Sequence, residues 1–187
     1  MAAASHVCPW WAGYFLLFPL RRLRQSPVKW LGPFVREGMT VLEPGPGMGY
    51  FTLDLARMVG PRGRVVAVDV QQKMLDVLRR RAVRAGLAER IDLRLVDPER
   101  PSIDDLAGQV DLVPAVFVVH EMPDQAAFFA AAHRALRPGG RLLVVEPRGH
   151  VKRHEFERSV ALAEAARFVR EPGSPFGRSQ GAVLVRG

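Results

Sequence analysis

From residue 39 onward, short runs of β-branched and aliphatic residues alternate with longer stretches of helical periodicity, and this alternation constrains the fold most. It is typical of a parallel sheet with helices on both faces. The predicted strands cover residues 40–43, 64–69, 91–96, 111–118, 141–146, 167–170 and 182–185, and the predicted helices cover residues 50–59, 71–85, 102–106, 124–136 and 152–166. Residues 171–181 leave no room for a crossover helix, so the last two strands should form an antiparallel hairpin. We therefore predict an α/β fold with a seven-stranded, mostly parallel sheet.

Residues 1–38 precede this core, and their sequence predicts helical pieces rich in aromatic residues. We expect them to fold as a lid that brings Trp10, Trp11 and Tyr14 to the acceptor side of a single domain at residues 39–187. The apolar run at residues 7–20 is too short to span a bilayer, and its arginines follow it, unlike the charges of a signal peptide. The single cysteine cannot form an intramolecular disulfide. A cytoplasmic location is the expectation.

A glycine-rich turn follows the first predicted strand. Gly45, Gly47 and Gly49 alternate with other residues just after Glu43, and an amphipathic helix follows them. Glycines allow a tight turn and close ligand approach, and the free N–H groups of a helix start favour negative charge. Asp69 ends the next strand, 20 residues after Gly49, where a carboxylate can accept hydrogen bonds from both ribose hydroxyls of an adenosine-containing ligand. Without Asp69, a purely structural strand-to-helix turn would be a serious alternative.

Details of the turn separate three ligand classes. A nucleoside-triphosphate loop requires Gly-Lys-Ser/Thr, whereas Met48-Gly49-Tyr50 follows Gly47 here. A nicotinamide fingerprint requires Gly-x-Gly-x-x-Gly, and Tyr50 stands where its third glycine would be. Glu43 would sit awkwardly near a pyrophosphate but suits a ligand that carries an ammonium group and a sulfonium.

Together these motifs resemble class I S-adenosylmethionine-dependent methyltransferases, and the small-molecule branch that includes ubiquinone and menaquinone C-methyltransferases is the most similar. The resemblance covers roughly residues 27–187: its motifs lie at residues 41–49, 65–70 and 111–121 and at the Pro-Gly-Gly turn within residues 136–143. It implies a Rossmann-like fold, S-adenosylmethionine as cofactor and methyl transfer to a small, hydrophobic acceptor. The implied cofactor-binding residues are Glu43, Gly45, Pro46, Gly47, Gly49, Asp69, Val70, Asp97 and Val116, with Asp97 near the adenine amino group.

Three prolines depart from the family pattern. Pro46 replaces the small residue usual between the first two glycines and should stiffen the turn. Pro98 follows Asp97, so the adenine edge would be held differently. Pro114 lies inside the fourth predicted strand, where a missing N–H is costly, and the sequence offers no explanation for it.

Candidate acceptor-side residues follow the fourth and fifth strands, because open α/β sheets bind ligands beyond the carboxyl ends of their strands. His120 and Glu121 follow the fourth strand, and Glu146, Arg148 and His150 follow the fifth. We take His120, Glu121 and His150 as catalytic candidates, and Glu146 and Arg148 as substrate-side candidates. A base is needed only if the acceptor loses a proton. His120, which titrates near neutral pH, is the preferred base, although a histidine that caps a helix or lines a pocket fits equally well.

The net charge of +8 raises the question of nucleic acid, but the arginines form small separate clusters. The cluster at residues 79–84 lies late in a predicted helix and should therefore point away from the cofactor. We expect a small-molecule acceptor, no specific nucleic acid and no membrane span; the sequence does not indicate an oligomeric state. A metal site could be imagined from His6 and Cys8 together with His120, Glu121 and His150. The spacing of these residues is not diagnostic of metal binding, so no metal is predicted.

Three alternatives remain open. An RNA or protein methyltransferase would fit the charge, but the fourth strand reads Ala-Val-Phe-Val at residues 115–118, not the Asn/Asp-Pro-Pro-Tyr/Phe of amino-methylating relatives. A non-catalytic S-adenosylmethionine-binding protein would keep the same turn. A nicotinamide oxidoreductase is disfavoured by the glycine spacing.

Overall fold

The computed structural model describes residues 25–97, 103–173, 176–177 and 179–187. Contacts divide the chain after Asp97 into a first unit, described over residues 25–97, and a second unit, described from residue 103 onward. Trp10, Trp11, Tyr14 and Pro98 lie outside the described residues, so the lid and the domain boundary at residue 38 stay predictions. No helix in the described part of the chain is long and apolar enough to cross a membrane.

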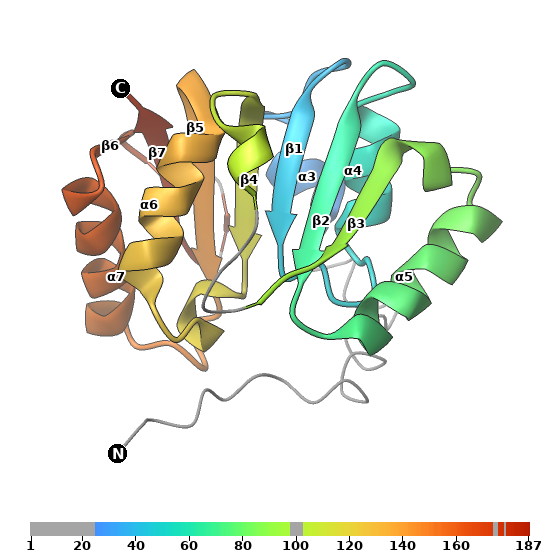
Figure 1. Ribbon diagram of the computed structural model, residues 1–187. Helices are drawn as coiled ribbons and strands as arrows, with labels where there is room; N and C mark the ends of the chain where they lie inside the picture. Colours follow the sequence, from blue (N-terminus) through green and yellow to red (C-terminus); the bar gives the residue numbers. More distant parts are fainter. Residues whose placement is uncertain (1–24, 98–102, 174–175, 178) are drawn as a thin grey trace. The chain divides into compact units, whose positions relative to one another are not determined.

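The first unit is a three-stranded parallel sheet with helices packed on it (Figure 1). Its elements are α3 (Pro27–Leu31), β1 (Thr40–Pro44), α4 (Thr52–Met58), β2 (Arg64–Asp69), α5 (Gln72–Arg84), η2 (Ala88–Arg90) and β3 (Ile91–Leu95). Strand β2 pairs with β1 on one side and with β3 on the other. Helix α4 packs against β2, and α5 packs against β2 and β3.

The second unit contains the parallel pair β4 and β5 and the antiparallel strands β7 and β6. Its elements are η3 (Asp104–Leu106), β4 (Val110–Val116), η4 (Val119–Glu121), α6 (Gln125–Ala135), β5 (Leu136–Glu146), α7 (Arg153–Ala165), β6 (Phe168–Arg170) and β7 (Gln180–Arg186). Helices α6 and α7 pack side by side, α6 in front of β5 in Figure 1 and α7 against β6 and β7.

The seven strands follow the order β3-β2-β1-β4-β5-β7-β6 in one sheet. This arrangement confirms the predicted mostly parallel sheet with a C-terminal antiparallel pair. Its central strands are continuous apolar runs: Val65, Val66 and Ala67 of β2 are fully buried, as are residues 142–145 of β5. Such runs are expected of parallel strands covered on both faces.

Three differences between the predicted and the observed elements are informative. Strand β4 ends at Val116, two residues early, because Phe117 adopts a φ of 60° and turns the chain out of the strand. Strand β5 begins at Leu136, and its register with β4 jumps from Val110↔Leu136 to Leu112↔Arg141. The Pro-Gly-Gly segment is therefore looped out as an irregularity, with Gly139 at a φ of 74°. Residues 104–106 form a 3-10 turn and not the predicted α-helix.

Candidate functional site

The glycine turn between β1 and α4 is held by backbone hydrogen bonds. The N–H of Gly45 donates to the carbonyl of Val68 at 2.9 Å, and that of Gly49 donates to the carbonyl of Pro46 at 2.9 Å. Gly45, Gly47 and Gly49 have φ values of 61°, 54° and 83°. These angles lie in the left-handed region that other residues rarely adopt, so the alternating glycines are required by the turn itself.

Gly47 and Gly49 face different surroundings. A Cβ built on Gly49 would overlap Cδ1 of Leu78, because α5 packs directly against the turn. A Cβ built on Gly47 would meet no atom of the described chain within 4 Å. The structure therefore uses Gly49 for packing and leaves space beside Gly47 for a ligand.

Asp69, the last residue of β2, is linked to the glycine turn. Its side chain accepts the N–H of Gly47 at 3.3 Å through Oδ2 and the N–H of Gln71 at 2.9 Å through Oδ1. Asp69 is buried, with an exposed fraction of 7%. Val70 follows it, partly exposed, and Asp97 is exposed just beyond β3, so the candidate residues of the first unit gather at the carboxyl ends of its strands.

Glu43 is a buried acid just before the turn. Its Oε2 atom and the Oγ1 atom of Thr52 make no hydrogen bond of ordinary geometry among the described residues. Burial raises the pKa of Glu43 to about 8; the nearby Thr52 hydroxyl offsets this in part, and the charge of Asp69 adds to it. A buried carboxyl group with one oxygen left without a hydrogen bond among the described residues suits a cationic ligand.

Arg81 contradicts the prediction that the whole arginine cluster of α5 points away from the cofactor. Its guanidinium donates to the carbonyl of Met48 in the glycine turn. Met48 also packs in a buried cluster with Met74 and Val77 of the same helix. The prediction failed because it considered only distance along the helix axis, whereas the long arginine side chain reaches back to the turn.

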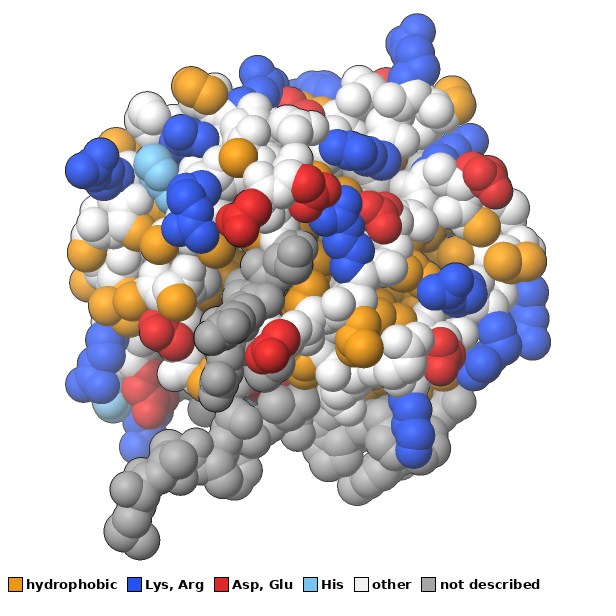
Figure 2. Space-filling model, in the orientation of Figure 1, with side chains coloured by type: hydrophobic (Ala, Val, Ile, Leu, Met, Phe, Trp, Pro, Cys, Tyr) orange, Lys and Arg blue, Asp and Glu red, His pale blue; other side chains and the backbone are white. Residues whose placement is uncertain are grey.

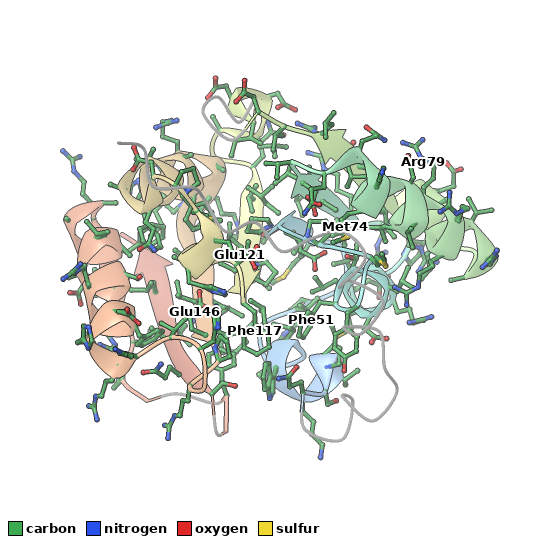
Figure 3. The ribbon with its side chains drawn as sticks, turned by 90° about the horizontal axis from the view of Figure 1, so that it is seen from below. Phe51, Met74, Arg79, Phe117, Glu121 and Glu146 are labelled. Carbon is green, nitrogen blue, oxygen red and sulfur yellow. The ribbon has the colours of Figure 1, made fainter. Side chains whose placement is uncertain are left out.

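The second unit places His120 against Glu146 at the carboxyl ends of β4 and β5. The turn at Phe117 leads into η4, and the backbone N–H of His120 donates to Oε1 of Glu146 at 3.2 Å. The Nδ1 atom of His120 lies 2.7 Å from Oε2 of the same carboxylate. Figure 3, seen from below, labels Glu146, Phe117 and Glu121 in this region. The exposed ring of His150 approaches His120 edge-on, with the ring centroids 4.9 Å apart.

The electrostatics of His120 follow from this pairing. Burial on its own would lower the pKa of His120, but the hydrogen bond to Glu146 and the charges of Glu146 and Glu121 raise it above its ordinary value. Glu146 is almost completely buried, with 2% of its side chain exposed. Nowhere in the described ranges do three His, Cys, Asp or Glu residues group as a metal ion would require.

Residues 41–140 match the family model described as a methyltransferase domain, a stretch that contains both the glycine turn and His120. The chain belongs to this family. The methyltransferase domain is 35% identical over 112 residues to the ubiquinone/menaquinone biosynthesis C-methyltransferase of Hahella chejuensis. That match covers 60% of this chain and 44% of the relative, so the chain spans less than half the length of the curated protein it matches.

Solved structures share the fold of this methyltransferase domain. A S-adenosylmethionine-dependent methyltransferase from Aquifex aeolicus superposes with a TM-score of 0.85 at 23% identity, covering 97% of this chain and 100% of that chain. A Haemonchus contortus phosphoethanolamine N-methyltransferase, solved with phosphomonomethylethanolamine and S-adenosylhomocysteine, superposes with a TM-score of 0.64 at 21% identity, covering 77% and 37% of the respective chains. These matches confirm a class I, Rossmann-like methyltransferase fold.

S-adenosylmethionine is the cofactor of this family, and the first unit fits it. The buried carboxyl group of Glu43 suits the cofactor's positive charge, the open side of Gly47 admits it, and Asp69 offers a carboxylate to a ribose. The roles of Val70, Asp97 and Val116 stay predictions; Val116 lies in the second unit, partly buried at the end of β4.

Sequence reasoning placed His120, Glu121, Glu146 and His150 in one region but missed the partnership between His120 and Glu146. The signal was present, because Glu146 directly follows the buried apolar run at residues 142–145, and a carboxylate there must be buried and need a partner. Arg148 is exposed and lines a cavity of about 580 Å³ with Arg153 and Arg170, on the β7 side of the second unit.

Alanine at Gly47 and at Gly49 is expected to have different effects. Gly47→Ala should cost about 1–2 kcal/mol from its positive φ and weaken S-adenosylmethionine binding, because the new methyl group enters the open side of the turn. Gly49→Ala should destabilise the fold further, because its methyl group overlaps Leu78. Thermal unfolding and calorimetric titration check both variants. Gly86→Ala is the matched control: it has a similar φ of 67° and open space, so it should lose stability but keep full affinity. Unchanged affinity in Gly47→Ala would contradict the assignment.

Proposed function

We propose that this chain transfers the methyl group of S-adenosylmethionine to a small, hydrophobic acceptor, with a ring carbon as the first candidate atom. The observation that carries the proposal is the 35% identity to a C-methyltransferase across 112 residues. S-adenosylmethionine supplies an electrophilic methyl group, which an acceptor nucleophile takes in line with the breaking carbon–sulfur bond while the electron pair stays on sulfur. The protein's task is to orient the acceptor and to exclude water.

The residues of each unit have separate tasks in this proposal. Glu43, the glycine turn and Asp69 hold the cofactor in the first unit. In the second unit, the acceptor is proposed to contact His120, Glu121 and His150. The edge-on contact of the two histidine rings places polar groups beside apolar strands there. Trp10, Trp11 and Tyr14 are proposed to cover the acceptor.

RNA methylation is the second candidate, because the net charge is +8. A nucleic-acid track requires a continuous basic surface. On the face seen in Figure 2, Lys and Arg side chains lie in separate patches with acidic side chains between them. Arg81 is moreover held by the Met48 carbonyl. The charge distribution on this face therefore favours the small-molecule acceptor.

Transfer of a labelled methyl group from S-adenosylmethionine distinguishes these functions. The assay compares short-chain quinols that lack one ring methyl group, simple phenols and total RNA. We expect label on a quinol or phenol, and RNA binding no tighter than about 10⁻⁶ M at physiological salt. Labelled RNA together with tight, sequence-selective binding would replace the proposal with RNA methylation. S-adenosylmethionine binding without transfer to any of these acceptors would count against it in favour of a non-catalytic binding protein.

A further inference from the structure

The pairing of His120 with Glu146 determines which nitrogen of the histidine is available for chemistry. The two oxygens of Glu146 contact two different atoms of one residue, the backbone nitrogen of His120 at 3.2 Å and its Nδ1 at 2.7 Å. An ionised carboxylate only accepts hydrogen bonds, so Nδ1 must carry the hydrogen. Neutral His120 therefore has its lone pair on Nε2.

Within the part of the chain that the structure describes, no group lies within hydrogen-bond distance of the Nε2 atom of His120. The Oε1 atom of Glu121 lies 3.9 Å from this nitrogen, which is too long for a hydrogen bond. The His120 side chain is 19% exposed, whereas that of Glu146 is 2% exposed. Nε2 is thus the accessible basic nitrogen of the pair, and the buried carboxylate of Glu146 orients the ring through Nδ1.

We infer that Glu146 is a positioning residue that fixes His120 as a proton acceptor through Nε2, and that the acceptor is a molecule that must lose a proton when it is methylated. This inference rests on the proposed function and narrows its substrate class to a hydroxyl or an acidified carbon. As the new bond to the methyl group forms, the acceptor's proton passes to Nε2 of His120. The resulting imidazolium is stabilised by the carboxylate of Glu146 and later releases the proton to water. A neutral tertiary amine, which has no proton to lose, falls outside this class.

The groups that face His120 are Glu146 from β5, Glu121 from η4 and His150 from the segment after β5. Both carboxylates favour the protonated ring. The transfer rate should therefore rise with pH through the pKa of His120, because only the neutral ring accepts a proton. Removing the charge of Glu146 should move this limb of the pH profile to lower pH.

The first experiment is an NMR titration of the histidine ring nitrogens in the cofactor-free protein, which needs no acceptor. In the unsubstituted protein we expect the Nδ1–H form of His120 and a pKa above the ordinary value. Glu146→Gln should lower that pKa and mix the two tautomers, whereas Glu121→Gln, the matched control, should shift it less and leave the tautomer unchanged. His133, which lies against Phe168, is the internal reference and should not respond. The inference would be overturned if neutral His120 carried its lone pair on Nδ1. It would also be overturned if the pKa of His120 were the same in Glu146→Gln as in the unsubstituted protein.

The second experiment is the pH profile of kcat with the acceptor found in the methyl-transfer assay. His120→Gln should lower kcat by about 10²- to 10⁴-fold, with the affinity for S-adenosylmethionine unchanged. Glu146→Gln should shift the acidic limb to lower pH. If Glu146→Gln does not fold, His120→Gln decides alone: full activity of that variant overturns the inference. Failure of every acceptor alongside the expected NMR result counts against the proposed function but leaves the paired geometry standing. A tertiary amine added to the same methyl-transfer assay should not be labelled, and labelling of that amine only would overturn the substrate class.

Discussion

Asp69→Ala is expected to weaken the binding of S-adenosylmethionine at least about tenfold. The substitution removes a carboxylate that can accept hydrogen bonds from the ribose, and each bond to a charged acceptor contributes about 1.5–3 kcal/mol. It also frees the N–H groups of Gly47 and Gln71, so the glycine turn loses part of its support. Asp69→Asn keeps one acceptor oxygen and should give an intermediate loss. Isothermal calorimetry measures both affinities.

The control for this prediction is Asp92→Ala. Asp92 lies on β3 beside Arg94, and 43% of its side chain is exposed, so its removal should leave cofactor affinity unchanged. NAD is the second ligand in the same titration and should not bind. Tight binding of NAD, or an unchanged affinity of Asp69→Ala for S-adenosylmethionine, would refute the assignment of this carboxylate to the cofactor.

The cofactor-free protein is expected to lose stability as the pH rises from about 4.5 to 8, because of Glu43. Its pKa is raised to about 8 in the folded state from an ordinary value of 4.5, so in this window the folded protein holds a proton that the unfolded chain has released. The free energy of unfolding therefore falls with pH, by about 5 kcal/mol, and levels off above pH 8. Glu43→Gln should remove most of this slope and leave the part above about pH 6.5 that comes from the raised pKa of His120. Denaturant unfolding at pH 5, 7 and 9 measures it.

Glu89→Gln is the matched control, because it removes an exposed carboxylate and should leave the slope unchanged. S-adenosylmethionine provides a second check. A cationic ligand near Glu43 favours the ionised carboxylate, so binding at pH 7 should release close to one proton, as calorimetry in buffers of different ionisation enthalpy detects. Equal proton release by Glu43→Gln would show that another group is responsible.

The fold was largely predictable because its strands are apolar runs of strand length separated by helical periodicity. Strand β2 at residues 64–69 matches its prediction at both ends, since Asp69 marks the point where the apolar run stops. The errors arose where one residue's conformation overrides the pattern. Phe117 is a bulky apolar residue whose type predicts a strand, yet its φ is positive while its N–H donates to the carbonyl of Val145 at 2.8 Å. The looped-out Pro-Gly-Gly segment has the same origin, because pairing with β4 recruits Leu136 into β5.

The two candidate clusters were predictable to different degrees. Spacing along the chain predicts the glycine turn and Asp69, because a strand, a turn and a helix fix their geometry locally. The other two contacts join residues that are far apart in the sequence. Arg81 and Met48 are 33 positions apart, and His120 and Glu146 are 26 positions apart. The pattern shows that Glu146 needs a partner, but only the packed side chains show which one it has.

The seating of α5 on the glycine turn has a consequence for amide hydrogen exchange. Leu78 fills the space that Gly49 leaves, and Arg81 from the following turn of the helix donates to the carbonyl of Met48. Local opening of α5 therefore breaks contacts of the turn, so the two segments should open as one cooperative unit. A ligand bound at the turn would then slow deuterium uptake along α5 as well, including amides a full helical turn or more from the ligand. Slower deuterium uptake in the late part of α5 would thus show that a ligand occupies the turn, without any chemical label attached to the protein.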